Sequence, residues 1–179
     1  CSSDLACQPK PVTEKEEALI YSPKYIQRTM HLLASGTPER KNTVRILVYG
    51  QSLSAQDWWL QVRDHLEEKF PAADLVMNNK SIGGFASQIL IRTVKRDILD
   101  LYPDLIIFHV FGSDRKYEEV LVEMRRNTAA EIMIWNDPPN KVPPSEWNTK
   151  MSYEIIPALA EKYHCKLIDL RTPIREMVE

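Results

Sequence analysis

The sequence predicts an α/β domain built on a parallel sheet, and the alternation of strand patterns with helix patterns is the main reason. Five short runs rich in β-branched and aromatic residues alternate with amphipathic segments long enough for helices. The first and third runs are apolar at nearly every position, which is typical of strands buried on both faces of a parallel sheet. Such connections form right-handed βαβ units with helices on both faces. We therefore expect a three-layer α/β/α fold with a flavodoxin-like, five-stranded parallel sheet.

The chain divides into two parts. Residues 1–22 contain prolines and a charge run and are expected to form an N-terminal tether or extension, whereas residues 23–179 carry the strand and helix patterns. Pro157 lies inside a long helical pattern and predicts a kink, because proline lacks the N–H that a helix interior requires. A last helix opens at Thr172-Pro173 and is unfinished at Glu179, so we expect a domain that is incomplete at its C-terminal end. The predicted strands are 44–49, 75–78, 105–111, 131–135 and 166–170, and the predicted helices are 22–35, 58–70, 87–101, 117–127 and 145–164.

The composition is that of a globular protein and excludes several classes. The chain has 179 residues, 44% of them hydrophobic, and a formal net charge of −2, which suits one domain with a full core. A basic patch with interleaved aromatic residues is absent, so nucleic acid is not an expected partner. The longest apolar run is too short to cross a bilayer. Neither a Cys-x-x-Cys pair nor a glycine-rich phosphate loop occurs, so we expect no metal and no cofactor.

The N-terminus allows two interpretations. The chain begins with Cys1 followed by small polar residues, which looks like a mature bacterial lipoprotein whose Cys1 carries lipid and ties the domain to a membrane surface. This interpretation predicts a secreted or cell-surface lipoprotein. An arbitrary fragment boundary is the alternative, and it leaves a cytoplasmic location open. In an oxidising compartment, Cys7 and Cys165 could pair and close the terminal segment onto the last strand.

The first strand leads to a serine that is a candidate nucleophile. The apolar run from Val44 stops at Gly50, which permits a tight turn, and Ser52 follows two residues later before a helical pattern opens. A serine on a sharp strand-to-helix turn is held out of the sheet at its carboxyl edge. Neighbouring backbone N–H groups can then face a developing oxyanion, as acyl transfer requires. The alternative is a turn whose serines only cap the helix.

Other small-residue turns are expected at the same edge of the sheet, where open α/β sheets bind ligands. The segments that follow successive predicted strands are 50–52, 81–84, 112–114 and 136–137. We take Gln51, Gly83 and Asp137 in these turns as candidate substrate contacts. Trp58, with its neighbour Trp59, could line a sugar-binding surface by stacking, although aromatic residues at the start of a helix more often belong to the core.

Three of these turns resemble the sequence blocks of the SGNH (GDSL-type) hydrolase superfamily, which comprises esterases, lipases and carbohydrate deacetylases. Gly50-Gln-Ser-Leu53 resembles the first block, with Gln51 where Asp is usual; a Gly-Gln-Ser form is known in carbohydrate-esterase branches. Asn79-Lys-Ser-Ile-Gly-Gly84 resembles the second block, and Gly112-Ser-Asp114 resembles the third. The resemblance covers residues 44–170, over which the order and spacing of the strands also agree.

The resemblance implies a role for each block. Ser52 would attack an ester carbonyl, and its own N–H and that of Gly84 would stabilise the tetrahedral oxyanion. The family's third donor is an Asn side-chain amide, but this chain has Asp114 at that place. A carboxylate only accepts hydrogen bonds and would repel an oxyanion. Asp114 could contribute if it were protonated, or it could orient the loop through backbone N–H groups.

The general base is not identified by the sequence. The family places it in an Asp-x-x-His block after the last strand and helix, and this chain contains no such block. His31 and His65 lie on predicted helices remote from the turns, His109 lies inside a strand, and His164 ends a helix at the opposite edge. Serine without a base is a poor nucleophile. We therefore expect the base on a segment beyond residue 179 or on a second chain, or else a degenerate site.

Two functions from different classes follow. The first is a serine esterase of the SGNH type that cleaves small acyl esters, such as acetyl groups, on a small molecule or on carbohydrate. The second is a non-catalytic SGNH-like binding or interaction domain of a larger surface protein, which Asp114 and the absent base favour. A flavodoxin-like nucleotide or flavin binder is a weaker third reading, because no phosphate-binding glycine motif follows any predicted strand.

Overall fold

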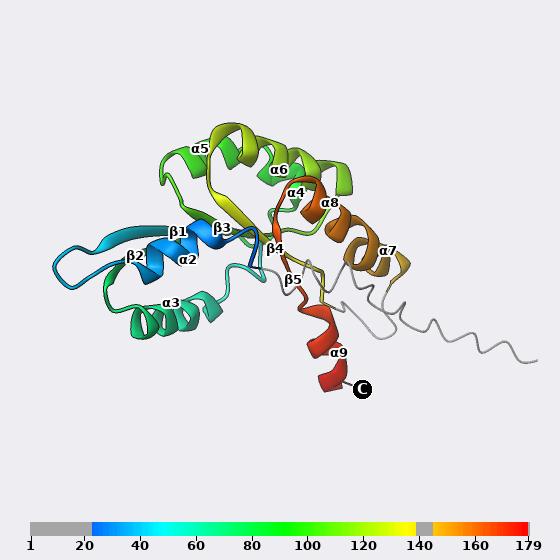
Figure 1. The fold of residues 1–179 in the computed structure, drawn as a ribbon. Coiled ribbons are helices and arrows are strands. Elements are labelled where there is room, and N and C mark those ends of the chain that lie inside the picture. The colour runs from blue at the N-terminus through cyan, green and yellow to red at the C-terminus, as the bar shows by residue number, and fades with distance from the viewer. Residues whose placement is uncertain (1–22, 139–144, 179) are drawn as a thin grey trace, which may run out of the picture.

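The computed structural model describes residues 23–138 and 145–178. Its centre is a five-stranded, wholly parallel sheet in the order β2-β1-β3-β4-β5 (Figure 1). This is the predicted flavodoxin-like order, because the chain moves from β1 outward to β2 and then crosses back to β3 on the other side. The strands are β1 (Asn42–Gly50), β2 (Ala73–Asn79), β3 (Leu105–His109), β4 (Glu131–Trp135) and β5 (Lys166–Ile168).

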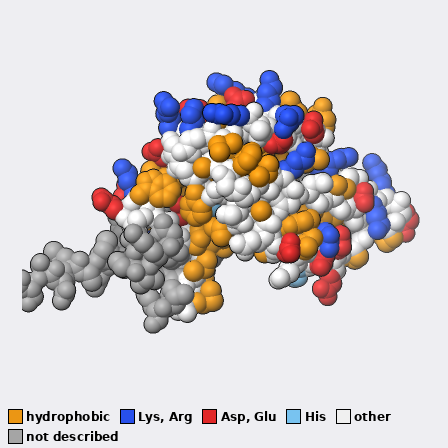
Figure 2. Space-filling model, turned by 180° about the vertical axis from the view of Figure 1, so that it is seen from behind, with side chains coloured by type: hydrophobic (Ala, Val, Ile, Leu, Met, Phe, Trp, Pro, Cys, Tyr) orange, Lys and Arg blue, Asp and Glu red, His pale blue; other side chains and the backbone are white. Residues whose placement is uncertain are grey.

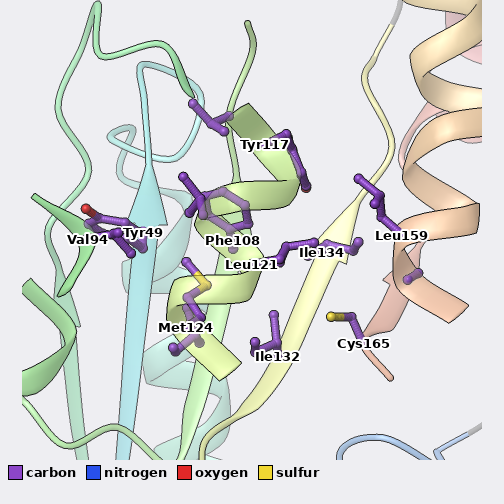
Figure 3. Packing of buried hydrophobic residues seen from close by; sticks show 14 of the residues in the cluster. Tyr49, Val94, Phe108, Tyr117, Leu121, Met124, Ile132, Ile134, Leu159 and Cys165 are labelled. Carbon is purple, nitrogen blue, oxygen red and sulfur yellow. The ribbon is translucent and has the colours of Figure 1, made fainter. Parts of the chain in front are cut away.

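Helices cover both faces of the sheet and give the expected three layers (Figure 1). One face packs against α2 (Gln27–Ala34) and α3 (Trp58–Lys69). The larger core lies on the other face, where β1, β3 and β4 meet the remaining core helices, as Figure 3 shows for Phe108 and Leu121. The helices on that side are α4 (Ser87–Leu90), α5 (Val94–Leu99), α6 (Asp114–Asn127), α7 (Glu146–Lys150) and α8 (Ile156–Lys162), and the described chain ends in α9 (Arg171–Val178).

Four helices differ from the prediction. The helix predicted over 22–35 begins only at Gln27. The segment predicted as one helix over 87–101 is broken into α4 and α5. The helix predicted over 117–127 begins three residues earlier, because the Ser113 hydroxyl accepts a hydrogen bond from the Lys116 N–H and caps it. The long helix over 145–164 is interrupted by a π-helical turn, Met151–Ile155, directly before Pro157. Proline lacks the N–H that would bond back into this turn, and the π-helical turn lies at that place; the kink at Pro157 stays a prediction.

The surface is mixed in charge. Seen from behind, Lys, Arg, Asp and Glu side chains all occur on the exposed face, with hydrophobic side chains between them (Figure 2). In the described parts of the chain, no helix combines the length and the apolarity that a bilayer crossing requires. Cys165 carries a buried free thiol. Its suggested partner Cys7 and the proposed lipid site Cys1 lie outside the described residues.

Candidate active site

The Ser52 corner, residues 50–55, is a tight turn at the carboxyl end of β1. A Cβ on Gly50 would lie 1.9 Å from the carbonyl oxygen of His109 on the neighbouring strand, so only glycine fits there. The turn closes with a hydrogen bond of 2.8 Å from the Ala55 N–H to the Gln51 carbonyl. Ser52 itself is exposed. The candidate nucleophile, Ser52, is therefore exposed to solvent on a turn whose backbone is constrained by close packing and a hydrogen bond.

The Gly84 turn, residues 80–86, lies directly beside the Ser52 corner. The Lys80 N–H donates to the Val48 carbonyl (3.0 Å), and the Ile82 N–H donates to the Gly50 carbonyl (3.1 Å), so the pairing of β1 with β2 continues beyond the end of β2. Gly84 has φ 81°, a conformation that favours glycine. A Cβ on Gly83 or Gly84 would meet nothing within 4 Å, and both residues are exposed. The turn is open to a ligand on the edge where Ser52 stands.

The Gly112 corner, residues 110–114, joins the other two. The Ser87 N–H donates to the Phe111 carbonyl (2.9 Å), and the Ser87 hydroxyl donates to the Ser113 carbonyl (3.0 Å). A Cβ on Gly112 would lie 2.5 Å from the Ser87 hydroxyl oxygen, which again requires glycine. The Gly112 corner is thus bonded to Ser87, the residue directly after the Gly84 turn, and the three predicted turns lie at one edge of the sheet.

Asp114 lies at the start of α6, next to the Gly112 corner. Its side chain is exposed, and its Oδ1 accepts a hydrogen bond of 2.8 Å from the Arg115 N–H. Negative charge is stabilised at the N-terminus of a helix. This contact is local to the helix start, and the third corner carries an exposed carboxylate.

The other predicted substrate contacts are covered to different degrees. Gln51 is 7% exposed, which leaves little of its side chain for a ligand. The Trp58 indole donates to the Leu53 carbonyl (2.8 Å) and meets Trp135 edge-on, with ring centroids 5.6 Å apart. Trp58 is half-buried and packs against the smaller core, so its hydrogen bond to Leu53 connects the Ser52 corner to that core. Its stacking on a sugar remains a prediction, as does the contact predicted for Gly83.

Asp137 lies at the carboxyl end of β4, and its side chain faces the interior. Both Asp137 and His109 are 0% exposed, and Asp137 Oδ1 is 3.3 Å from His109 Nε2. Burial lowers the pKa of His109 to about 3, so the imidazole is neutral. Burial raises the pKa of Asp137 to about 7, against the charge of Arg171 and a hydrogen bond from Asn148. A substrate would reach Asp137 only if this region opened, so its predicted role as a contact remains a prediction.

A polar network around Asp137 was not predicted from the sequence. Arg171 is 2% exposed, and its Nη1 donates to the Asp137 carbonyl (3.0 Å), to Asn148 Oδ1 (2.6 Å) and to the Ser152 hydroxyl (3.2 Å). The guanidinium carbon also lies 5.1 Å from the centre of the Tyr153 ring. An arginine after the last strand is ordinarily a surface residue. Its burial depends on contacts with the π-helical region, which no local pattern reveals.

The four histidines do not supply an evident base. His31 and His65 are exposed on α2 and α3, and His164 stacks on Tyr25 at the opposite edge of the sheet. His109 is packed in β3, as predicted, with its ring stacked on Trp135 at 5.0 Å. In the described ranges, Ser52 has no hydrogen bond to a histidine, and no group of three or more His, Cys, Asp or Glu side chains is arranged to hold a metal.

The parallel sheet in this strand order, with helices on both faces, is the SGNH hydrolase fold. No protein-family model and no curated protein sequence matches the chain. Solved structures do match. The chain is similar to the acetyl xylan esterase AlAXEase, with a TM-score of 0.61 at 18% identity, covering 73% of this chain and 79% of that one.

Two further structures have the same fold. A catalytic mutant of Axe2, an acetylxylan esterase from Geobacillus stearothermophilus, has a TM-score of 0.65 at 13% identity and covers 80% of this chain and 81% of its own. A two-domain esterase (CEX) active on acetylated mannans has a TM-score of 0.70 at 18% identity. It covers 87% of this chain, whereas this chain spans 44% of the mannan esterase. At these identities the likeness establishes the fold.

Proposed function

We propose that the protein is a serine esterase that cleaves small acyl esters, with Ser52 as nucleophile. One observation carries the proposal: an exposed serine stands on a corner whose Gly50 carbonyl is bonded to the adjacent, exposed Gly84 turn (3.1 Å to the Ile82 N–H). A nucleophile and an open backbone turn on one edge are the parts that acyl transfer needs.

In the proposed mechanism the Ser52 oxygen adds to the ester carbonyl and forms a tetrahedral oxyanion, while its proton passes to the general base. The N–H groups of Ser52 and Gly84 stabilise this oxyanion, and each such donor contributes roughly 2.7–4 kcal/mol in comparable sites. When the intermediate collapses, the ester C–O bond breaks, and the leaving oxygen takes the proton back from the base and departs as the alcohol. Water, deprotonated by the same base, then attacks the acyl-enzyme, which releases the carboxylic acid and returns the proton to Ser52. Asp114 orients the third corner through its contact with the backbone at the start of α6.

The proposed substrate is an acetyl or similarly small acyl ester, with carbohydrate as the carrier of the acyl group. Three proteins of the same fold are described as acetyl xylan esterases or as active on acetylated mannans. The general base comes from outside the described residues, on a further segment of the chain or on a second chain.

The test is hydrolysis of p-nitrophenyl acetate and of acetylated xylo- or manno-oligosaccharides by the whole protein expressed from its gene. Ser52→Ala is expected to lower kcat to background, because the attacking oxygen is removed. Ser54→Ala is the matched control, since the Ser54 hydroxyl is buried and faces the His109 carbonyl at 3.5 Å. Turnover that is unchanged in Ser52→Ala would eliminate the role given to that residue.

A non-catalytic binding or interaction domain of a larger surface protein is the second candidate. It is favoured by the carboxylate at Asp114, where an amide donor is expected, and by the burial of His109, whose Nε2 faces Asp137. This function predicts that acetylated oligosaccharides bind without release of acetate. Calorimetry together with an acetate assay on the same sample separates the two functions.

A further inference from the structure

Asn79, the last residue of β2, hydrogen-bonds two of the three corners with one side chain. Its Nδ2 donates to the carbonyl oxygen of Ser54 at 2.7 Å, and its Oδ1 accepts from the N–H of Ser81 at 2.8 Å. Ser54 belongs to the Ser52 corner and Ser81 to the Gly84 turn. The amide therefore ties the turn that carries the proposed nucleophile to the turn that carries the proposed oxyanion donor.

The position of Asn79 in the sheet makes this link rigid. Asn79 pairs with Val48 in the β1–β2 register, and the next residue, Lys80, continues the pairing through its N–H to the Val48 carbonyl. The Asn79 backbone is thus fixed against β1 while its half-buried side chain reaches the turn beyond β1. Both amide hydrogen bonds are shorter than 3 Å, and a planar amide holds its donor and acceptor at a fixed separation.

We propose that Asn79 is a positioning residue that fixes the Ser52 corner and the Gly84 turn relative to each other. The catalytic part of this inference rests on the proposed function. The Ser52 hydroxyl and the Gly84 N–H must both reach one substrate carbonyl, and a displacement of about 1 Å in such a pair can lower the rate about 100-fold. Asn79 prevents such a displacement by holding the two turns together, and this role requires no contact with the substrate.

Two substitutions separate the two bonds. Asn79→Ala removes both. Asn79→Asp keeps an acceptor for the Ser81 N–H but places a carboxylate oxygen against the Ser54 carbonyl, so the link to the Ser52 corner is lost. Asn78→Ala is the matched control, because Asn78 is the preceding residue of β2 and its side chain points to the other face of the sheet.

Amide hydrogen exchange measured by NMR tests the link without any turnover. The Ala55 N–H, which closes the Ser52 corner, is expected to exchange faster in both Asn79 variants. The Ser81 N–H is expected to exchange faster in Asn79→Ala and to stay protected in Asn79→Asp. Wild-type exchange at both amides in Asn79→Ala, or equal changes in Asn78→Ala, would overturn the inference.

Steady-state kinetics tests the catalytic part. Well below the melting transition, both Asn79 variants are expected to lower kcat about 10- to 100-fold with KM changed less than about threefold, because the reacting groups are displaced while the binding surface stays. A purely structural role would lower the unfolding midpoint and leave kcat unchanged, and that result refutes the positioning role. A wild-type protein without ester turnover would instead refute the proposed function, and the exchange experiment would still decide the link.

Discussion

The buried pair of His109 and Asp137 predicts an unusual dependence of folding stability on pH. Burial lowers the pKa of His109 from 6.5 to about 3, and burial raises the pKa of Asp137 from 3.8 to about 7. From pH 4 to 6 the folded pair therefore holds one proton, on Asp137, and the unfolded pair also holds one, on His109. Stability changes with pH only where the two states bind different numbers of protons. The pair as a whole contributes almost no slope in this interval.

His109 and Asp137 contribute opposite pH dependences to folding stability, and replacing one of them leaves the pH dependence of the other uncompensated. His109 is protonated in the unfolded state and neutral in the folded state. Its contribution therefore makes folding stability rise with pH by about 1.4 kcal/mol per pH unit. Asp137 is protonated in the folded state and ionised in the unfolded state. Its contribution therefore makes folding stability fall with pH at about the same rate. His109→Phe should therefore lose stability relative to wild type by roughly 3 kcal/mol from pH 4 to 6, and Asp137→Asn should gain a similar amount.

The assay is urea unfolding at pH 4, 5 and 6, followed by circular dichroism, with the wild-type free energy subtracted at each pH. Phenylalanine at position 109 keeps a ring against Trp135. His65→Phe is the control, because His65 is exposed on α3. The protonation states assigned to the pair would be refuted by either of two results. The difference in unfolding free energy from wild type could stay constant with pH in both variants, or it could change with pH in the same direction in both.

Two further predictions concern stability and are checked by urea unfolding at pH 7. Arg171→Ala should destabilise the protein by about 3–5 kcal/mol, because a buried charge that satisfies several acceptors is lost. Arg115→Ala on the exposed face of α6 should change stability by less than about 0.5 kcal/mol. A small effect at Arg171 would show that its buried hydrogen bonds contribute little to stability. Gly50→Ala should cost at least about 2 kcal/mol, because its methyl group would meet the His109 carbonyl, and Gly83→Ala, with open space around it, should be nearly neutral. Equal effects at the two glycines would show that the close approach of β1 and β3 is relaxed at little cost.

The sheet and the meeting of the three corners could be predicted because both follow from local signals. Apolar runs such as 105–109 mark strands buried on both faces, and parallel strands bring their carboxyl ends to one edge. Glycines at 50, 84 and 112 then mark the turns. The breaks were harder to place: the pattern over 87–101 reads as one helix, whereas α4 and α5 are separated by residues 91–93.

The buried polar network could not be predicted, because it depends on residues that are distant in sequence. His109, Asp137 and Arg171 follow or end three different strands, and each looks like an ordinary strand or surface residue in its own segment. Asn148 and Ser152 join them from a helix whose π-helical turn sets their direction. Trp58 illustrates the same limit, since its contact with Leu53 depends on the angle at which α3 leaves the turn.

Several of the bonds around the three corners run between main-chain groups, such as the Ile82 N–H with the Gly50 carbonyl and the Ser87 N–H with the Phe111 carbonyl. Main-chain groups are present whatever side chains a sequence carries. The side chains around such an edge can therefore differ and contact different molecules while the main-chain geometry of the turns stays the same. The same fold is found in esterases with which the chain shares 13% to 18% of its residues, at TM-scores of 0.61 to 0.70.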